Sequence, residues 1–99
     1  MKQIIDGKLY NTETATFIGE GGRWCGDFRD YWEKLYKTPR GRFFLAGEGG
    51  PMSSYAESCG DGWTGGKKII PLSEEEAREW AEKFLKADEY LEYFKAEEA

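Results

Sequence analysis

A glycine-rich segment contains the residue types that come nearest to a ligand-binding loop. Gly47, Gly49 and Gly50 surround Glu48 and precede Pro51. Glycines let backbone N–H groups approach an anion closely, as they do in phosphate-binding loops. The segment lacks the Lys and Ser/Thr of a P-loop, however, and Glu48 would repel a phosphate. The alternative interpretation is therefore a glycine-rich loop at the end of a strand.

Two aromatic residues follow this segment and could form the wall of a small-ligand site. Tyr55 and Trp63 lie in or beside glycine-rich stretches, where burial in a core is less assured. Aromatic rings in such positions can stack on nucleobases. One functional hypothesis is therefore a module that sequesters a small ligand or nucleotide, and its ligand-binding residues would be Gly47, Gly49, Gly50, Tyr55 and Trp63.

The residue types that most enzymes and metal sites use are sparse or poorly spaced. The chain has no histidine, its cysteines Cys25 and Cys59 stand far apart, and its serines lie in neither an S-x-x-K nor a G-x-S-x-G context. We therefore expect a protein that is not an enzyme and that uses no cofactor and no metal. In a reducing compartment two such cysteines are more often free thiols than a disulfide.

Carboxylates are concentrated near the end of the chain. The 99 residues carry a net charge of −5. Residues 1–71 hold ten Lys/Arg against nine Asp/Glu, whereas residues 72–99 hold four against ten. An anionic surface repels the phosphates of DNA and RNA and attracts basic surfaces. We therefore expect no direct nucleic-acid binding and a partner with a Lys/Arg-lined groove.

The acidic segment has the pattern of an amphipathic helix from Ser73 to Ala99. Ser73 and Glu76 form a capping box, and apolar residues then recur at helical spacing. This stripe comprises Ala77, Trp80, Ala81, Phe84, Leu85, Leu91 and Phe94. The rhythm breaks at Ala87–Asp88, where we expect a kink. The candidate partner-binding acids are Glu75, Glu79, Glu82, Glu89 and Glu92.

An ordinary solvated surface is the alternative interpretation of these acids. Three Glu-to-Lys/Arg pairs have i,i+4 spacing in the favourable order, as on many solvent-facing helices. They are Glu74–Arg78, Glu79–Lys83 and Glu82–Lys86. Such pairs partly cancel the negative field, so the acids alone do not distinguish a binding surface from a merely soluble one.

The rest of the chain predicts a small antiparallel sheet. Asp6-Gly7 lies between two short apolar runs, which is the signature of a type I′ hairpin. A second hairpin is predicted around Pro39 and Gly41, with Leu35 and Phe44 on its buried face. The predicted strands are Gln3–Ile5, Lys8–Tyr10, Glu33–Lys37, Arg42–Ala46 and Lys67–Ile70.

Two short helices complete the expected elements. Asn11 or Thr12 can cap a helix that runs to Ile18 and ends at Gly19, although the threonines make a strand the competing interpretation. Residues Met52–Ser58 could form one or two helical turns, and the stretches Gly21–Gly26 and Cys59–Gly66 read as loops.

The expected fold class is a single α+β domain over residues 1–99. It has a small antiparallel sheet of three to five strands packed against a C-terminal amphipathic helix, with a short N-terminal helix. The charge of Asp6 lies too close to the start of the chain to leave room for the apolar stretch of a signal peptide. No apolar run is as long as a membrane span. We therefore expect a cytoplasmic location and no membrane contact.

Several of these segments together resemble a family of small proteins carried by bacterial phages and conjugative elements. The similar segments are Asp6–Ala15, Leu35–Thr38, Phe44–Met52, Tyr55–Ser58 and Ile69–Trp80. The resemblance covers almost the whole chain, whereas Gly19–Gly26 is individual to this protein. It implies no catalytic or ligand residue.

The resemblance implies a class of function. Small acidic phage proteins often act stoichiometrically on a host defence complex, as anti-CRISPR proteins do. The leading hypothesis is therefore an inhibitor of a host protein or ribonucleoprotein defence complex, acting by steric block or nucleic-acid mimicry. A maintenance role in the mobile element, with a surface that only confers solubility, is a further alternative. The sequence does not predict an oligomeric state.

Overall fold

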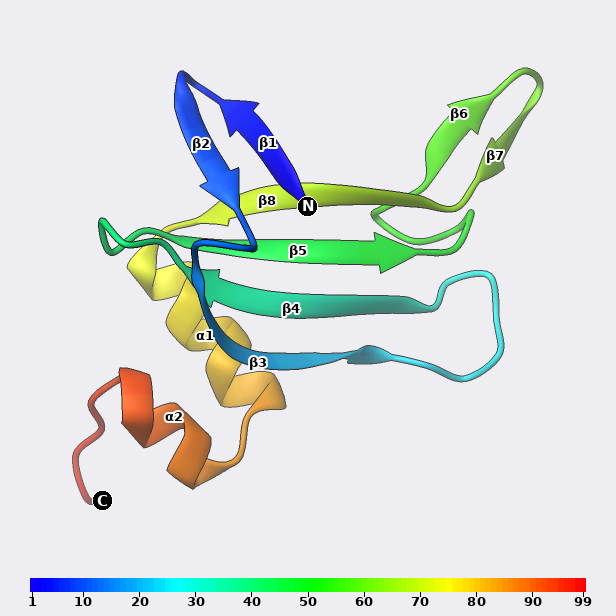
Figure 1. Ribbon diagram of the computed structural model, residues 1–99. Helices are drawn as coiled ribbons and strands as arrows, with labels where there is room; N and C mark the ends of the chain where they lie inside the picture. The colour runs from blue at the N-terminus through cyan, green and yellow to red at the C-terminus, as the bar shows by residue number, and fades with distance from the viewer.

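The computed structural model describes residues 1–99, and a four-stranded antiparallel sheet is its central element (Figure 1). The strand order is β3-β4-β5-β8, from Thr16–Arg23, Tyr31–Lys37, Phe43–Gly49 and Gly66–Leu72. Two separate hairpins pair β1 (Lys2–Ile5) with β2 (Lys8–Asn11), and β6 (Glu57–Cys59) with β7 (Gly62–Thr64). Helices α1 (Glu74–Phe84) and α2 (Ala87–Tyr93) follow β8.

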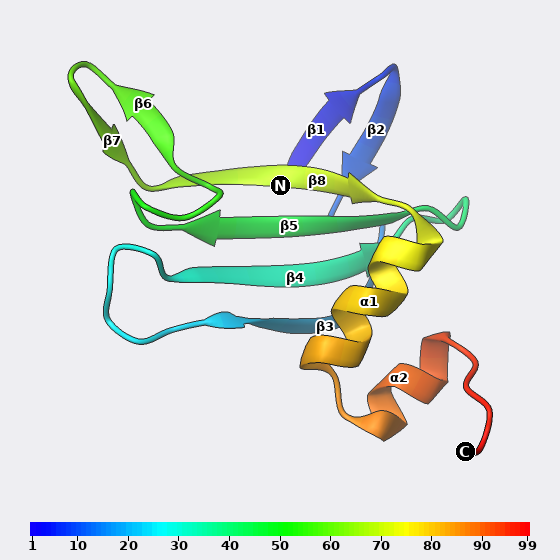
Figure 2. The same ribbon diagram turned by 180° about the vertical axis from the view of Figure 1, so that it is seen from behind.

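Helix α1 crosses one face of the sheet, and α2 continues beyond the β3 edge (Figure 2). The main core forms between this face and the helices, where Trp80 of α1 is 8% exposed. Phe94, just after α2, stacks on Phe43 of β5 with 5.4 Å between ring centroids. The buried members of this core are Ile18, Leu35, Phe43, Leu45, Ala77, Trp80, Ala81 and Phe94.

A second, smaller core lies on the opposite face, under the β1–β2 hairpin. Tyr10 packs edge-on against Phe44 with 5.4 Å between ring centroids, and Ile69 completes the buried cluster. Leu35 and Phe44 are both fully buried, but not on the one face that the sequence predicts. Successive strand residues point to opposite faces, so the sheet buries Leu35 under α1 and Phe44 under the hairpin.

Both predicted hairpin turns and the capping box are confirmed. Asp6 and Gly7 have φ values of 52° and 73°, as a type I′ turn requires. Strands β4 and β5 pair directly across the second turn. The Ser73 hydroxyl accepts the Glu76 N–H at 3.1 Å, and the Glu76 carboxylate accepts the Ser73 N–H at 2.9 Å.

The expected fold class is wrong. The protein is mostly β, with 43% strand and 18% helix, and its eight strands form three sheets. The N-terminal helix does not exist, and the number of strands exceeds three to five. The three strands beyond the predicted five are β3, which lies where a helix and a loop were expected, and β6 and β7, which form a hairpin that pairs only with itself.

The segment predicted as a helix over Asn11–Ile18 contains a turn and the start of β3. The Asn11 side chain accepts the Glu13 N–H at 3.0 Å and forms a turn instead of a helix cap. Thr16 and Phe17 then pair with β4. β-branched and aromatic residues favour strands, so the competing strand interpretation is the correct one.

The segment Met52–Ser58 also differs from its predicted helical turns. Ser53 closes a turn, since its hydroxyl donates to the Gly50 carbonyl at 2.7 Å and accepts the Tyr55 N–H at 3.1 Å. Strand β6 begins at Glu57. Both predicted loops are shorter than expected, because β3 continues to Arg23 and β6 and β7 occupy half of Cys59–Gly66.

The C-terminal helix is interrupted two residues before the predicted kink. Leu85 adopts an extended conformation and ends α1, and Lys86 precedes α2. Leu91 does not belong to the buried stripe, since it is 55% exposed. Neither helix has the length and apolar character needed to cross a membrane.

Candidate functional site

Helix α1 presents three of the five predicted partner-binding acids together. Glu75, Glu79 and Glu82 are all exposed. Their spacing of four and three residues places them on one side of α1, opposite the buried side that carries Ala77 and Trp80. We call these three residues the α1 acidic face.

The α1 acidic face is less neutralised than the sequence predicts. Of the three predicted i,i+4 pairs only Glu74–Arg78 lies within ion-pair distance, at 3.9 Å. Lys83, the expected partner of Glu79, instead extends over the Phe84 ring, 5.0 Å from its centroid. Glu79 and Glu82 therefore face solvent without an ion-pair partner.

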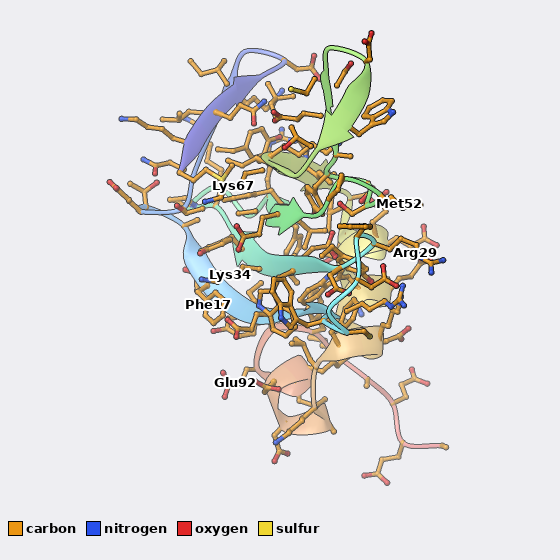
Figure 3. The ribbon with its side chains drawn as sticks, turned by 90° about the vertical axis from the view of Figure 1, so that its right-hand side faces the viewer. Phe17, Arg29, Lys34, Met52, Lys67 and Glu92 are labelled. Carbon is orange, nitrogen blue, oxygen red and sulfur yellow. The ribbon has the colours of Figure 1, made fainter.

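The other two predicted acids lie on α2 and form a separate group. Glu89 and Glu92 are exposed, and Glu89 accepts the Lys86 N–H at 3.1 Å as part of the α2 cap. Glu92 projects on the side of the molecule that carries Phe17 and Lys34, which is the sheet face turned away from α1 (Figure 3). The five acids therefore do not form one continuous row.

The glycines of the segment Gly47–Gly50 mainly allow neighbouring residues to pack closely against the backbone. Gly47 and Gly49 belong to β5, and the Gly50 N–H donates to the Asp30 carbonyl at 2.8 Å. A Cβ on Gly47 would enter the Tyr55 ring, and one on Gly50 would approach the Phe28 carbonyl to 2.6 Å. These glycines allow close packing, and their backbone does not form a phosphate-binding nest.

Tyr55 is not a ligand-stacking wall but part of a buried hydrogen-bond network. Its side chain is 1% exposed, and its hydroxyl donates to the Glu33 carboxylate. The other Glu33 oxygen accepts the Trp80 indole N–H at 2.9 Å. Burial, reinforced by the hydrogen bond to Glu33, raises the pKa of Tyr55 above its usual value. The network joins β4, the β5–β6 connection and α1.

Glu33 was not among the predicted functional residues, although the sequence contains a signal for it. Glu33 is two residues from Leu35 on β4, so strand alternation places both side chains on the same buried face. A carboxylate there requires hydrogen-bond donors. Both donors come from distant segments, and no sequence pattern pairs them with Glu33.

A cleft of about 610 Å³ opens at the end of the sheet where β3–β4 and β5–β6 connect. Gly49 and Gly50 line it, and Trp24 and Phe28 supply its aromatic surface. Tyr55 and Trp63 are not among its lining residues, and Trp63 is 67% exposed on β7. The structure therefore brings only two of the five predicted ligand-binding residues into one cleft.

The wall of this cleft is fixed by a buried carboxylate. Asp30 accepts backbone N–H groups from Cys25, Gly26 and Asp27 at 3.0, 2.7 and 3.0 Å. The hydrogen bond from Cys25, together with those from Asp27 and Gly26, holds the pKa of Asp30 below its usual range. These donors are occupied, and Lys67, the one cation in the lining, pairs with Glu48 at 3.6 Å, so the cleft offers little to a phosphate.

Cys25 and Cys59 are exposed free thiols.

No protein-family model, curated protein or solved structure matches the chain.

Proposed function

We propose that this protein is a stoichiometric inhibitor of a bacterial defence complex and that it acts through the α1 acidic face. The observation that carries the proposal is the orientation of Glu75, Glu79 and Glu82, which lie exposed on one side of a helix anchored by Trp80. The resemblance to phage and mobile-element proteins supports the choice of target.

The mechanism follows from the chemistry of that face. Defence complexes that bind nucleic acid line their channels with Lys and Arg. Carboxylates fixed on a rigid helix can occupy those cations and block the channel, either sterically or by imitating phosphates. Glu89 and Glu92 would then contact a different part of the partner, because they lie on α2.

A plaque assay tests whether the protein inhibits a defence complex at all. The protein is expressed in bacterial strains that each carry one active CRISPR system, and each strain is infected with a phage that its system targets. We expect plating efficiency to rise by orders of magnitude in at least one strain and the protein to co-purify with that effector. Unchanged plating across the panel, with no co-purification, would refute the proposal.

A small-ligand function is the second candidate, and the cleft beside Gly49 and Gly50 is the observation that favours it. Its volume of about 610 Å³ lies in the range of ligand pockets. Trp24 and Phe28 could stack on an uncharged planar ring. A nucleoside that raises the melting temperature of the wild type but not of Trp24→Ala would support this function. Trp63→Ala is the matched control.

A further inference from the structure

Two tight turns enclose a second cleft at the opposite end of the central sheet. One is the β1–β2 turn at Gly7, and the other joins β4 to β5 (Figure 1). The cleft has a volume of about 750 Å³. Its lining residues are Gly7, Lys8, Leu9, Tyr10, Thr38, Pro39, Arg40 and Arg42.

The charges that line this cleft are all positive. Lys8, Arg40 and Arg42 line it, and no acidic residue does. None of the three forms an ion pair within 4.0 Å. Asp6 is the only acid in the two turns, and it is not part of the lining. In a chain of net charge −5, three unpaired cations around one cleft mark a place where an anion would relieve their mutual repulsion.

The turn that carries both arginines is held by Thr38. Its hydroxyl accepts the Arg42 N–H at 3.0 Å, and its N–H donates to the Arg42 carbonyl at 2.7 Å. The Gly41 N–H donates to the Thr38 carbonyl at 2.9 Å. The backbone positions from which the two guanidinium groups extend are therefore fixed before a ligand arrives, which lowers the entropic cost of binding.

Acids at the start of α1 could also compete for these cations, because α1 begins beside the β4–β5 turn (Figures 1 and 2). Two of them are already engaged. Glu74 pairs with Arg78, and Glu76 accepts the Ser73 N–H. The third, Glu75, neither lines the cleft nor pairs with its cations, so the cleft is available to an external anion.

We infer that this basic cleft binds a phosphorylated small molecule. Arg40 and Arg42 would donate forked hydrogen bonds to phosphate oxygens, and Lys8 would add a point charge. Leu9 and Pro39 provide an apolar wall for the organic part of the ligand. All three cations line one cleft of about 750 Å³, a volume within the range of small-molecule pockets, which favours a compact anion over an extended nucleic-acid backbone. The inference does not depend on the proposed function.

Isothermal titration calorimetry on the purified full chain tests the inference, with inorganic pyrophosphate and ADP as probes. We expect saturable binding that weakens with added salt. The variant Arg40→Gln/Arg42→Gln should bind at least about tenfold more weakly, since charged hydrogen bonds are lost. The matched control is Arg23→Gln/Arg29→Gln, which removes two exposed arginines near the other cleft and should bind like the wild type.

Three results would overturn the inference. The first is the absence of measurable binding of either probe to the folded wild type. The second is an equal loss of affinity in both double variants, which would indicate non-specific charge attraction. The third is binding of a single-stranded thymidine oligonucleotide without binding of pyrophosphate or ADP, which would assign the cleft to a nucleic-acid backbone. Circular dichroism of each variant confirms that it is folded.

Discussion

Glu33 joins three parts of the protein that the sequence keeps far apart. Its two oxygens accept one hydrogen bond from Tyr55 and one from Trp80, and no buried side-chain polar atom in the protein lacks a partner. Glu33 is 9% exposed, and its carboxylate forms no ion pair. Removing any member of this network leaves a buried polar group unsatisfied.

Loss of this network should destabilise the fold. Glu33→Gln presents an amide donor to a site that already holds two donors, and Tyr55→Phe leaves one Glu33 oxygen without its partner. Each variant should lower the free energy of unfolding by about 1–3 kcal/mol. Urea denaturation measures the change, with Glu20→Gln on the exposed surface of β3 as control. If the free energies of unfolding of both network variants matched that of the control, the hydrogen bonds would make no net contribution to stability.

Acid should weaken the β3–β4 connection through Asp30. Its pKa is lowered in the folded state, chiefly by the backbone N–H of Cys25, so the unfolded chain binds its proton more readily. The stabilisation is therefore complete above the unfolded pKa of about 3.9 and is lost as the pH falls through the lower folded pKa.

Urea midpoints measured from about pH 7 to about pH 2.5 test this prediction. The midpoint of the wild type should fall steeply in the acid range, whereas Asp30→Asn should start lower and fall less. Asp27 and Glu76, whose pKa values are also lowered, leave a residual slope in the variant. Identical slopes for the two proteins would mean that Asp30 does not contribute.

At the scale of elements, the C-terminal end of α1 packs directly on two glycines of β3, where no side chain separates the helix from the strand backbone. A Cβ on Gly19 would collide with Leu85, and one on Gly21 would come within 2.5 Å of the Phe84 ring. Both glycines belong to the edge strand β3. Their absence of side chains sets the distance between the helix and the sheet, and hence the direction in which the α1 acidic face points.

Filling this contact should displace the helix. Gly21→Ala should lower the free energy of unfolding by about 1–3 kcal/mol, since the added methyl group overpacks the contact with Phe84. Gly62→Ala in β7 is the matched control, because its Cβ would meet nothing within 4 Å. Thermal denaturation compares the two variants. A loss in Gly21→Ala no larger than in the control would show that α1 adjusts to the methyl group freely.

Local signals predicted those elements that depend on local chemistry. The Asp6-Gly7 turn and the Ser73 capping box each rest on residues a few positions apart, and both are confirmed. The helix expected over Asn11–Ile18 failed because pairing with β4, about twenty residues away, decides the conformation of Thr16 and Phe17. Leu85, where α1 ends, packs against Gly19, a contact with a residue far away in the sequence that no local pattern reveals.

At the scale of the whole molecule, charge is divided between two surfaces. The helices carry exposed acids, whereas Lys8, Arg40 and Arg42 line the cleft between two turns. The uneven distribution of acids along the sequence predicted the first surface. The second was not predicted, because its cations come from turns about thirty residues apart and lie close together only in the folded chain. The orientation of Glu92 away from the α1 acidic face had no sequence signal either.

An inhibitor that acts through exposed carboxylates should be sensitive to salt. Its affinity for a basic partner should fall as ionic strength rises, mainly through slower association, because the Debye length shrinks below about 10 Å above 0.1 M salt. Surface plasmon resonance with the effector identified in the plaque assay measures both rate constants. An affinity independent of salt would point to an apolar interface, for which exposed Trp24 and Phe28 are the candidates.

The most direct measurement is a comparison of two triple variants in the same plaque assay. Glu75→Gln/Glu79→Gln/Glu82→Gln removes the α1 acidic face, and Glu13→Gln/Glu57→Gln/Asp61→Asn removes three exposed acids elsewhere, so both change the net charge equally. We predict that the first variant remains folded and loses inhibition, whereas the second inhibits like the wild type. Full inhibition by the first variant, or equal loss in both, would contradict a role for this face.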